Sequence, residues 1–207
     1  MFLAVAGNIG AGKSSLTSLL AERYALEPVY EAVDENPYLE DFYTDMKRYA
    51  FHSQIFFLSR RLEQHLAQVN PGSRVIQDRT IYEDASVFAR NLFEEGVMDA
   101  RDYSAYRAMY EAIRRTLKPP DVLVYLRSSV PTLQTRIAQR GRDYEAAIQT
   151  SYLEQLNRLY DEWIEAYDLS PKLTLDADRL DFVSKEEDLQ AVMKRLGPYG
   201  LTAPILP

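Results

Sequence analysis

Residues 1–15 read MFLAVAGNIGAGKSS, and this stretch decides the fold. Phe2–Ala6 is an apolar run without polar alternation, which is typical of a strand buried on both faces of a parallel sheet. A glycine-rich loop follows directly, and Lys13–Tyr24 then has the length and pattern of a helix. A glycine loop between a buried strand and a helix is the setting in which such loops bind phosphate.

The loop itself has two glycines separated by four residues and followed by lysine and serine: Gly7-Asn8-Ile9-Gly10-Ala11-Gly12-Lys13-Ser14. Glycines let the backbone wrap tightly enough for successive N–H groups to point at phosphate oxygens, and the helix N-terminus adds a positive dipole. We expect Lys13 to reach the β- and γ-phosphates of a triphosphate and the Ser14 hydroxyl to hold Mg²⁺, with Ser15 next to them. The motif predicts nucleotide binding.

Strand-like and helix-like segments alternate along the rest of the chain. The further β-prone runs are Pro28–Glu31, Arg74–Gln77, Val122–Leu126 and Leu173–Leu175. The other helix-length segments are Arg48–Ala67, Tyr82–Glu94, Ala100–Thr116, Glu145–Tyr167 and Lys185–Leu196. This alternation predicts an α/β fold with a five-stranded parallel sheet flanked by helices, and the loop makes it P-loop NTPase-like. We expect a single domain over 1–207, with 197–207 as an irregular tail that holds three prolines and two glycines.

The composition restricts the class of protein. Of the 207 residues, 46% are hydrophobic and 27% are charged, as in soluble globular proteins. The formal net charge of −7 argues against nucleic-acid binding by phosphate neutralisation. Cysteine is absent, which excludes disulfides, thiolate metal sites and cysteine nucleophiles. With no secretion signal and no apolar run of membrane-spanning length, we expect a cytoplasmic protein without nucleic-acid or membrane partners.

Acidic side chains follow two of the predicted strands. Tyr30-Glu31 ends the second strand and Gln77-Asp78-Arg79-Thr80 ends the third. The carboxyl ends of the strands in a doubly wound sheet open onto the ligand crevice, so we expect Glu31, Asp78 and Arg79 to face the phosphates. A carboxylate there can accept a proton from an attacking hydroxyl or hold the metal, and an arginine can steady the transferring group.

A third group of candidates is rich in arginine. Arg136 and Arg140 are four residues apart and therefore share one face of a predicted helix, which Gly141 ends before Arg142. Guanidinium groups clustered over a phosphate site neutralise the charge that builds up in the transition state. We expect an arginine-rich lid over ATP in which Arg136 and Arg140 assist catalysis.

Together these features resemble the deoxynucleoside kinases, the family of deoxycytidine, deoxyguanosine and deoxyadenosine kinases. The resemblance covers nearly the whole chain and rests on the Gly7–Ser14 loop, Glu31, Asp78-Arg79-Thr80 with Asp84, Lys118-Pro119-Pro120-Asp121, and Arg136…Arg140-Gly141-Arg142…Glu145. It implies Mg²⁺-dependent phosphate transfer from ATP to the 5′-hydroxyl of a deoxynucleoside in nucleotide salvage. It also implies a homodimer.

The resemblance implies roles for the residues around the reacting group. Asp78 looks like the family's carboxylate base, although Asp replaces the commoner Glu, and Glu31 stays an alternative proton acceptor. Arg79 resembles the residue that holds the 5′-oxygen. Tyr43 and Glu145 resemble the pair that binds the sugar 3′-hydroxyl.

The resemblance also extends to residues beside the adenine of ATP and beside the base of the acceptor nucleoside. Leu180-Asp181-Phe182 resembles the loop beside the adenine of ATP. Gln54 and Arg61 are seven residues apart on one helix face, and with Asp84 they resemble the family's base-reading trio. A glutamine amide suits the edge of adenine and an arginine fork suits O6 and N7 of guanine, so a purine is favoured and deoxycytidine stays open. A direct alignment through Leu58-Ser59-Arg60 would shift both assignments by one residue.

Other nucleotide-binding functions share the phosphate loop. A nucleoside monophosphate kinase has the same loop and lid, but Glu31 would repel its phosphorylated acceptor. A nucleotide-gated switch would hydrolyse ATP slowly and bind a partner in one nucleotide state, and no segment resembles a partner-facing switch. A GTPase would need an Asn/Thr-Lys-x-Asp base reader, which the sequence lacks.

Overall fold

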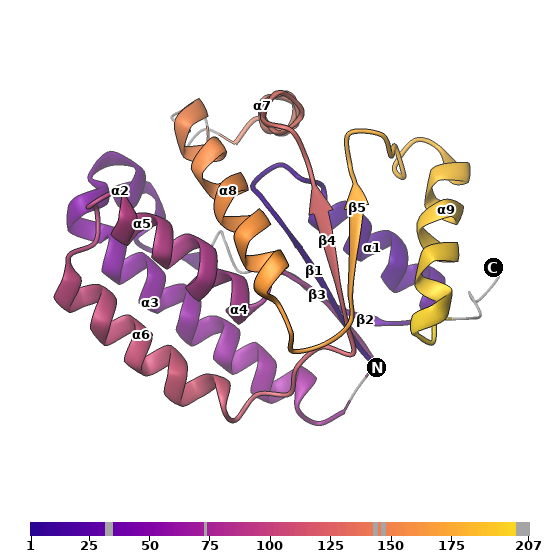
Figure 1. Cartoon of the computed structure of the whole chain (residues 1–207), viewed down its shortest axis with the longest axis horizontal. Helices are drawn as coiled ribbons and strands as arrows, with labels where there is room; N and C mark the ends of the chain where they lie inside the picture. Colours follow the sequence, from indigo (N-terminus) through magenta and orange to yellow (C-terminus); the bar gives the residue numbers. More distant parts are fainter. Residues whose placement is uncertain (32–34, 73, 143–144, 146–147, 202–207) are drawn as a thin grey trace.

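The computed structural model describes residues 1–31, 35–72, 74–142, 145 and 148–201. Within them, five strands form one parallel sheet in the order β2-β3-β1-β4-β5 (Figure 1). The strands are β1 (Phe2–Gly7), β2 (Glu27–Val29), β3 (Val75–Asp78), β4 (Val122–Arg127) and β5 (Lys172–Asp176). This confirms the predicted α/β fold. After β1 the chain runs to β2 over one face of the sheet, and after β3 it runs to β4 over the other face. The loops that follow β1 and β3 therefore separate, which leaves a crevice between them.

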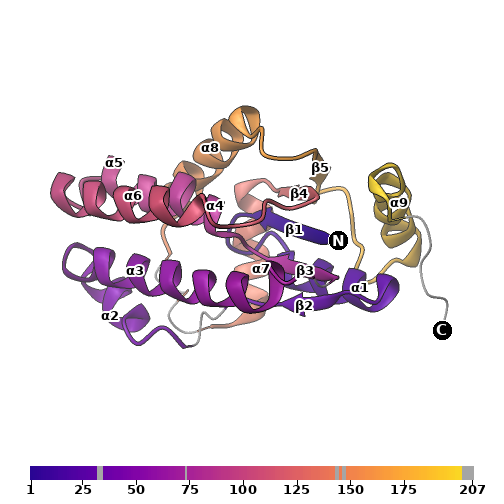
Figure 2. The same cartoon turned by 90° about the horizontal axis from the view of Figure 1, so that it is seen from below.

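Helices cover both faces of the sheet (Figures 1 and 2). On one face, α1 (Lys13–Tyr24) and α9 (Glu186–Leu196) share a core with Leu3 and Val5 of β1. On the other, α3 (Met46–Gln64), α6 (Ala100–Arg114) and α8 (Thr150–Ala166) share a core with Phe2, Ala4 and Ala6. Successive side chains of a strand point to opposite faces, and both faces of β1 are covered, which explains its continuous apolar run.

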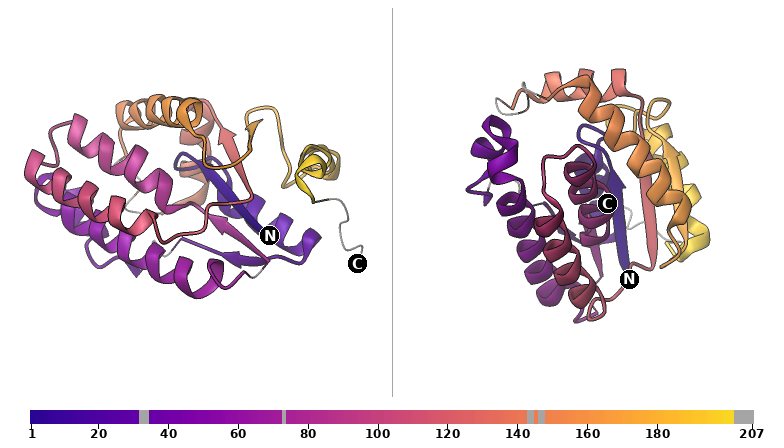
Figure 3. Two further views of the ribbon diagram at one scale, coloured as in Figure 1. Left: turned by 60° about the horizontal axis from the view of Figure 1, so that its bottom comes forward. Right: turned by 60° about the vertical axis from the view of Figure 1, so that its left-hand side comes forward.

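Shorter elements connect these layers. They are α2 (Leu39–Thr44), the π-helix His65–Val69, α4 (Ile81–Glu83), the π-helix Asp84–Ala89, α5 (Arg90–Glu94), α7 (Val130–Arg140) and the 3₁₀ turn Gly197–Tyr199. Figure 3 shows α3 and α6 side by side at one end of the molecule and α8 crossing the sheet. No helix in the described ranges is both long and apolar enough to span a bilayer.

Several predicted segments differ from the structure. The second strand is Glu27–Val29, so Tyr30 and Glu31 follow it and do not end it. The helix predicted over Tyr82–Glu94 contains the π-helix Asp84–Ala89. The helix predicted over Glu145–Tyr167 begins only at Thr150, so Glu145 lies outside it, in a turn that follows α7. The predicted irregular tail contains the Gly197–Tyr199 turn, and Leu201 is buried in the core beside α9. Residues 202–207 lie outside the described part.

Candidate active site

The glycine loop after β1 has the backbone that phosphate binding requires. Gly10 and Gly12 have φ angles of 81° and 95°, which favour glycine. A Cβ atom on Gly10 would lie 2.9 Å from the carbonyl oxygen of Leu133. Lys13 Nζ donates to the Asn8 carbonyl at 2.9 Å. Burial and the nearby Arg79 guanidinium lower the pKa of Lys13 to about 8, so the ammonium is still mostly protonated at neutral pH.

The Asn8 side chain braces this loop. Its Nδ2 donates to Asn157 Oδ1 at 2.8 Å and to the Leu153 carbonyl at 3.1 Å, and its Oδ1 accepts from the Ile9 N–H at 2.7 Å. The loop is thereby tied to α8. Ala11, also predicted to contact ATP, is buried in the core.

A pocket of about 350 Å³ opens beside the loop. Its lining contains most of the side chains that the sequence predicts for catalysis and nucleoside binding: Lys13, Glu31, Tyr43, Gln54, Asp78, Arg79, Asp84, Arg140 and Glu145. Arg61 and Arg136 are not among them, while Ile9, Ser14 and Arg142, predicted for ATP or metal binding, also line it. Sequence reasoning missed the rest of the wall: Tyr30, Leu39, Phe42, Ser53, Phe57, Phe88 and Tyr152. Two of these aromatic residues had a signal, because Phe57 and Phe88 stand one helical turn after Gln54 and Asp84.

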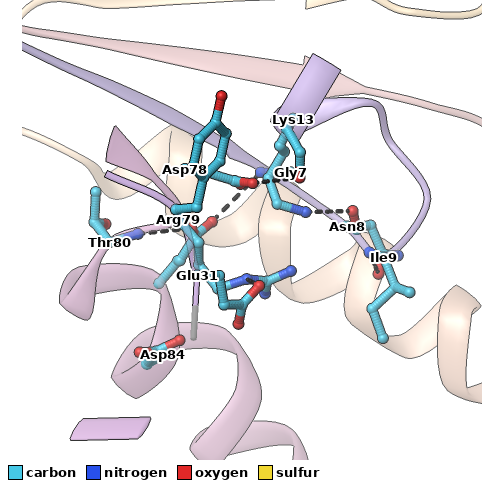
Figure 4. Close-up of polar contacts among 12 residues, drawn as sticks. Gly7, Asn8, Ile9, Lys13, Glu31, Asp78, Arg79, Thr80 and Asp84 are labelled. Atoms are coloured by element: carbon cyan, nitrogen blue, oxygen red, sulfur yellow. Dashed lines mark hydrogen bonds and ion pairs between the residues drawn. The ribbon is translucent and has the colours of Figure 1, made fainter. Parts of the chain in front are cut away.

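Glu31 lies just past the end of β2, between two arginines. Its Oε1 accepts from Arg61 Nη2 at 2.7 Å, and its Oε2 accepts from Arg79 Nε at 3.0 Å. Burial alone would raise the pKa of the Glu31 carboxyl, but the two guanidinium groups outweigh it and lower the pKa to about 2. Glu31 therefore enters the reaction as a carboxylate. Figure 4 shows Lys13, Glu31, Asp78 and Arg79 together beside the phosphate loop.

Asp78 faces the phosphate loop instead. The sheet register sets it opposite Val5 of β1, and its Oδ2 accepts from the Ser14 hydroxyl at 2.5 Å. Its Oδ1 is buried and has no hydrogen-bond partner in the described part of the chain. This carboxylate oxygen lies beside a serine hydroxyl, and the pair fits Mg²⁺. The ion prefers oxygen ligands and commonly takes several from nucleotide phosphates. Over the same described ranges no cluster of three or more acidic or histidine side chains could hold a metal, so phosphate and water oxygens would complete this site.

Arg79 has a strained backbone and a fixed side chain. Its φ of 66° is unusual for a residue with a side chain, and such strain is typical of functional sites. Its N–H donates to the Val5 carbonyl at 2.9 Å, which continues the β1–β3 ladder. Its guanidinium carbon lies 4.2 Å from the centre of the Phe88 ring, and Nη1 donates to the Tyr160 hydroxyl at 3.3 Å.

The two arginines between which the sequence leaves the base-reading register open lie in different surroundings. Arg61 is buried, where Nε donates to Asp84 and Nη1 donates to the Arg79 carbonyl at 3.1 Å. Arg60 pairs with Glu35 and Glu63, and neither arginine is among the residues that line the pocket. Gln54 lines the pocket, and its Oε1 is buried with no hydrogen-bond partner in the described ranges.

The arginine-rich segment bridges the loop and the pocket. Helix α7 ends at Arg140, and Gly141 adopts a φ of 66°. Arg140 donates to both carboxylate oxygens of Glu145, from Nε at 3.0 Å and from Nη2 at 2.5 Å. Arg136 donates to the Ala11 carbonyl at 3.1 Å and to the Ala177 carbonyl at 2.8 Å. Arg136 thus links the phosphate loop to the residue after β5, and Arg140 pairs with Glu145, which is predicted to bind the sugar.

A second pocket, of about 530 Å³, lies on the other side of the loop. Its lining holds most of the residues predicted to bind ATP: Gly10, Gly12, Lys13, Ser14, Ser15, Arg136, Arg140, Arg142, Leu180, Asp181 and Phe182. The other four, Gly7, Asn8, Ile9 and Ala11, do not line it. Lys13, Ser14, Arg140 and Arg142 line both pockets. Two pockets that meet at a phosphate loop, one for a donor and one for an acceptor, define a P-loop phosphotransferase.

Comparison with known proteins names the family. The family model described as deoxynucleoside kinase matches residues 3–198. The chain is 37% identical to the deoxyadenosine/deoxycytidine kinase of Bacillus subtilis and 39% identical to the deoxyguanosine kinase of Lactobacillus johnsonii, in each case over 94% of this chain and 90% of the relative. Its fold matches deoxyadenosine kinase from M. mycoides with bound dCTP at a TM-score of 0.84 and 32% identity, over 96% of this chain and 100% of that chain. The chain belongs to the deoxynucleoside kinase family.

Proposed function

We propose that this protein transfers the γ-phosphoryl group of ATP to the 5′-hydroxyl of a deoxynucleoside. The observation that carries the proposal is the meeting of the two pockets at Lys13, Ser14, Arg140 and Arg142. ATP would bind with its phosphates on the loop, and the sugar would enter from the side of Glu31. Phosphoryl transfer depends mainly on positioning and charge stabilisation, which this arrangement of cations supports.

Charge in the acceptor pocket favours an acceptor without a phosphate. Glu31 is ionised and lines that pocket, while Arg61 and Arg79 are already paired with carboxylates. A phosphorylated acceptor would bring a second negative group toward Glu31, which costs Coulomb energy in a buried site. The hydroxyl of a neutral sugar can instead donate a hydrogen bond to this carboxylate.

Within this function, we propose Glu31 as the proton acceptor and Asp78 as the metal ligand. This moves the base from the residue matched by the family resemblance to the alternative. The support is the direction of each carboxylate, because Glu31 is held by two arginines and Asp78 accepts from Ser14. In a loose transition state the hydroxyl keeps its proton until late, so the main task of the base is to orient the hydroxyl. A carboxylate of low pKa can do this.

Ser14 and Asp78 are the residues that would hold Mg²⁺ together with phosphate oxygens. When bound, the ion supplies charge neutralisation on the β- and γ-phosphates. Lys13 binds the same phosphates, and Arg79 lies beside Glu31, where it holds the 5′-oxygen in line with them. Arg136 and Arg140 close the donor side.

For the acceptor, we propose a purine deoxynucleoside. Gln54 Oε1 has no hydrogen-bond partner in the described residues, so a base with an exocyclic amino group would satisfy it. The Arg61 guanidinium carries five N–H donors, and its described bonds to protein use three of them. The relatives named above are kinases of deoxyadenosine, deoxycytidine and deoxyguanosine, and the base of each of these nucleosides carries an amino group.

Product analysis tests the proposed function. The protein is incubated with Mg-ATP and each of the four deoxynucleosides or their monophosphates, and products are separated by chromatography. We expect 5′-monophosphates from deoxyadenosine and deoxyguanosine, with thymidine the poorest acceptor. Turnover of monophosphates alone would show a nucleoside monophosphate kinase, and ATP hydrolysis that no deoxynucleoside diverts would show a switch.

Arg61→Met is expected to lower kcat/KM for purine deoxynucleosides by about 30-fold, because a buried recognition group is lost. Because Arg61 also donates to Glu31, part of the loss falls on every nucleoside. The total loss should still be smaller for thymidine, so the ratio of the purine value of kcat/KM to the thymidine value falls. Arg60→Met is the matched control: it removes an exposed neighbour whose ion pairs contribute little, and both values should stay within about twofold of wild type. Equal losses on every nucleoside with Arg61→Met would contradict a base-reading role.

We also propose that the protein acts as a homodimer. Tyr106 and Tyr110 of α6 are buried in the chain's own core, whereas Met109 on the same helix is 47% exposed. Single exposed apolar side chains are also common on monomers, so the support for this proposal is the family resemblance. Sedimentation velocity should give twice the mass of one chain, and a single species at the mass of one chain would contradict this.

A further inference from the structure

Glu83 is a buried carboxyl group that the mechanism above leaves without a role. It ends α4 and is completely buried. Its Oε1 accepts from the Thr80 N–H at 2.9 Å, and its Oε2 accepts from the Tyr160 hydroxyl at 3.0 Å and from the Gly7 N–H at 3.4 Å. One carboxyl group thus joins the turn after β3, the first residue of the phosphate loop and helix α8.

Tyr160 extends these contacts to Arg79. The Tyr160 oxygen accepts from Arg79 Nη1 at 3.3 Å, so its own proton is directed to Glu83. The Tyr160 ring also packs edge-on against Phe88, with ring centres 6.1 Å apart, and Phe88 lies under the Arg79 guanidinium. Arg79 is therefore held at Nε by Glu31 and at Nη1 by Tyr160.

The hydrogen bonds from Arg79 to Tyr160 and from Tyr160 to Glu83 keep this donor order only if Glu83 is a carboxylate. It only accepts, so Arg79 donates to Tyr160 and Tyr160 donates to Glu83. An amide at the same place would turn an N–H either toward Tyr160 and Gly7 or toward Thr80, and so would oppose at least one of these donors. Burial raises the pKa of the Glu83 carboxyl to about 7 although Arg79 and Lys13 lower it, so the carboxylate that this direction requires predominates above that pH. Placing an ionisable group there is costly for folding, and such groups cluster at functional sites.

We propose that Glu83, acting through Tyr160, is a positioning residue that fixes Arg79 relative to the phosphate loop. The inference rests on the proposed function, in which Arg79 holds the 5′-oxygen. Without the chain of bonds both substrates still bind in their pockets, but Arg79 keeps only its contacts with Glu31 and Phe88, and its Nη1 end can shift from where the phosphoryl group passes. The expected loss is therefore in kcat, because small misplacements of catalytic groups slow the chemical step strongly.

The test compares full-length variants in steady-state kinetics with ATP and a deoxynucleoside. Tyr160→Phe keeps the ring and removes the hydroxyl, and it should lower kcat about 10-fold with both KM values within about threefold of wild type. Glu83→Gln should lower kcat about 30-fold, since it also disturbs the bonds to Thr80 and Gly7. The double variant should match Glu83→Gln within about twofold, because either change already breaks the path to Arg79.

Tyr24→Phe is the matched control. It removes the hydroxyl of another buried tyrosine, which donates to the Met193 carbonyl at 3.4 Å on the opposite face of the sheet, and kcat should not change. A Tyr160→Phe enzyme with wild-type kcat, losses confined to KM, or losses that multiply in the double variant would each overturn the proposal. Where Glu83→Gln does not fold, Tyr160→Phe decides alone. Absence of turnover in the wild-type enzyme would instead refute the proposed function.

Discussion

Glu31→Gln is expected to lower kcat by about 1,000-fold, within the range that a general base contributes. Glutamine keeps the size of the side chain but cannot take the proton of the 5′-hydroxyl. It also removes the negative charge that pairs with Arg61 and Arg79, so both guanidinium groups lose their charged partner at this position. Because the donor pocket is not altered, the KM for ATP should change by less than about threefold.

Steady-state kinetics with the preferred deoxynucleoside measure this effect, and calorimetry on the same variant measures whether the nucleoside still binds. Glu35→Gln is the matched control, since Glu35 is an exposed glutamate that pairs with Arg60 outside the pocket. If Glu31→Gln kept near-normal kcat while a change at Asp78 abolished it without altering metal dependence, the proton acceptor would be Asp78.

Asp78→Asn is expected to lower kcat by about 300-fold at ordinary Mg²⁺ concentrations, since a metal supplies several kcal/mol of charge stabilisation. The asparagine amide replaces one carboxylate oxygen with an N–H donor, which cannot ligate a cation. The Mg²⁺ concentration for half-maximal rate should rise about 10-fold or more, as the site loses a charged ligand.

Initial rates over a Mg²⁺ titration at fixed ATP check this prediction. Asp161→Asn serves as control, because Asp161 pairs with Arg127 at the surface, away from the two pockets. A titration curve unchanged in midpoint, together with a collapsed kcat, would show that Asp78 handles the proton and not the metal.

Most of the fold could be predicted from the sequence because the strands are short apolar runs and the loop after the first one has a defined spacing. Helix α2, Leu39–Thr44, was missed since six residues are too few to show a helical period. The start of α8 was placed too early. Its buried stripe begins at Leu153, whereas Glu145 belongs to the preceding turn and is held by Arg140 across it.

The charged residues that line the two pockets could be predicted, but most of the aromatic wall could not, and neither could the contacts that each acid makes. Glu31 and Asp78 both follow strands, and only their contacts with Arg61 and Ser14 distinguish them. Tyr160 shows a second limit. Its spacing with Leu156 and Trp163 predicts a core residue, and its ring is indeed in the core. The hydroxyl at the end of that ring reaches Arg79 and Glu83, which no sequence period reports.

A crystal structure with a deoxynucleoside and a non-hydrolysable ATP analogue tests the central claim most directly. We expect the analogue's γ-phosphate on the loop at Lys13. We expect the sugar 5′-oxygen within hydrogen-bonding distance of the Glu31 carboxylate, about 2.6–3.2 Å. A nucleoside bound outside this pocket, or bound inside it with its 5′-oxygen turned away from Glu31 and the γ-phosphate, would contradict the account.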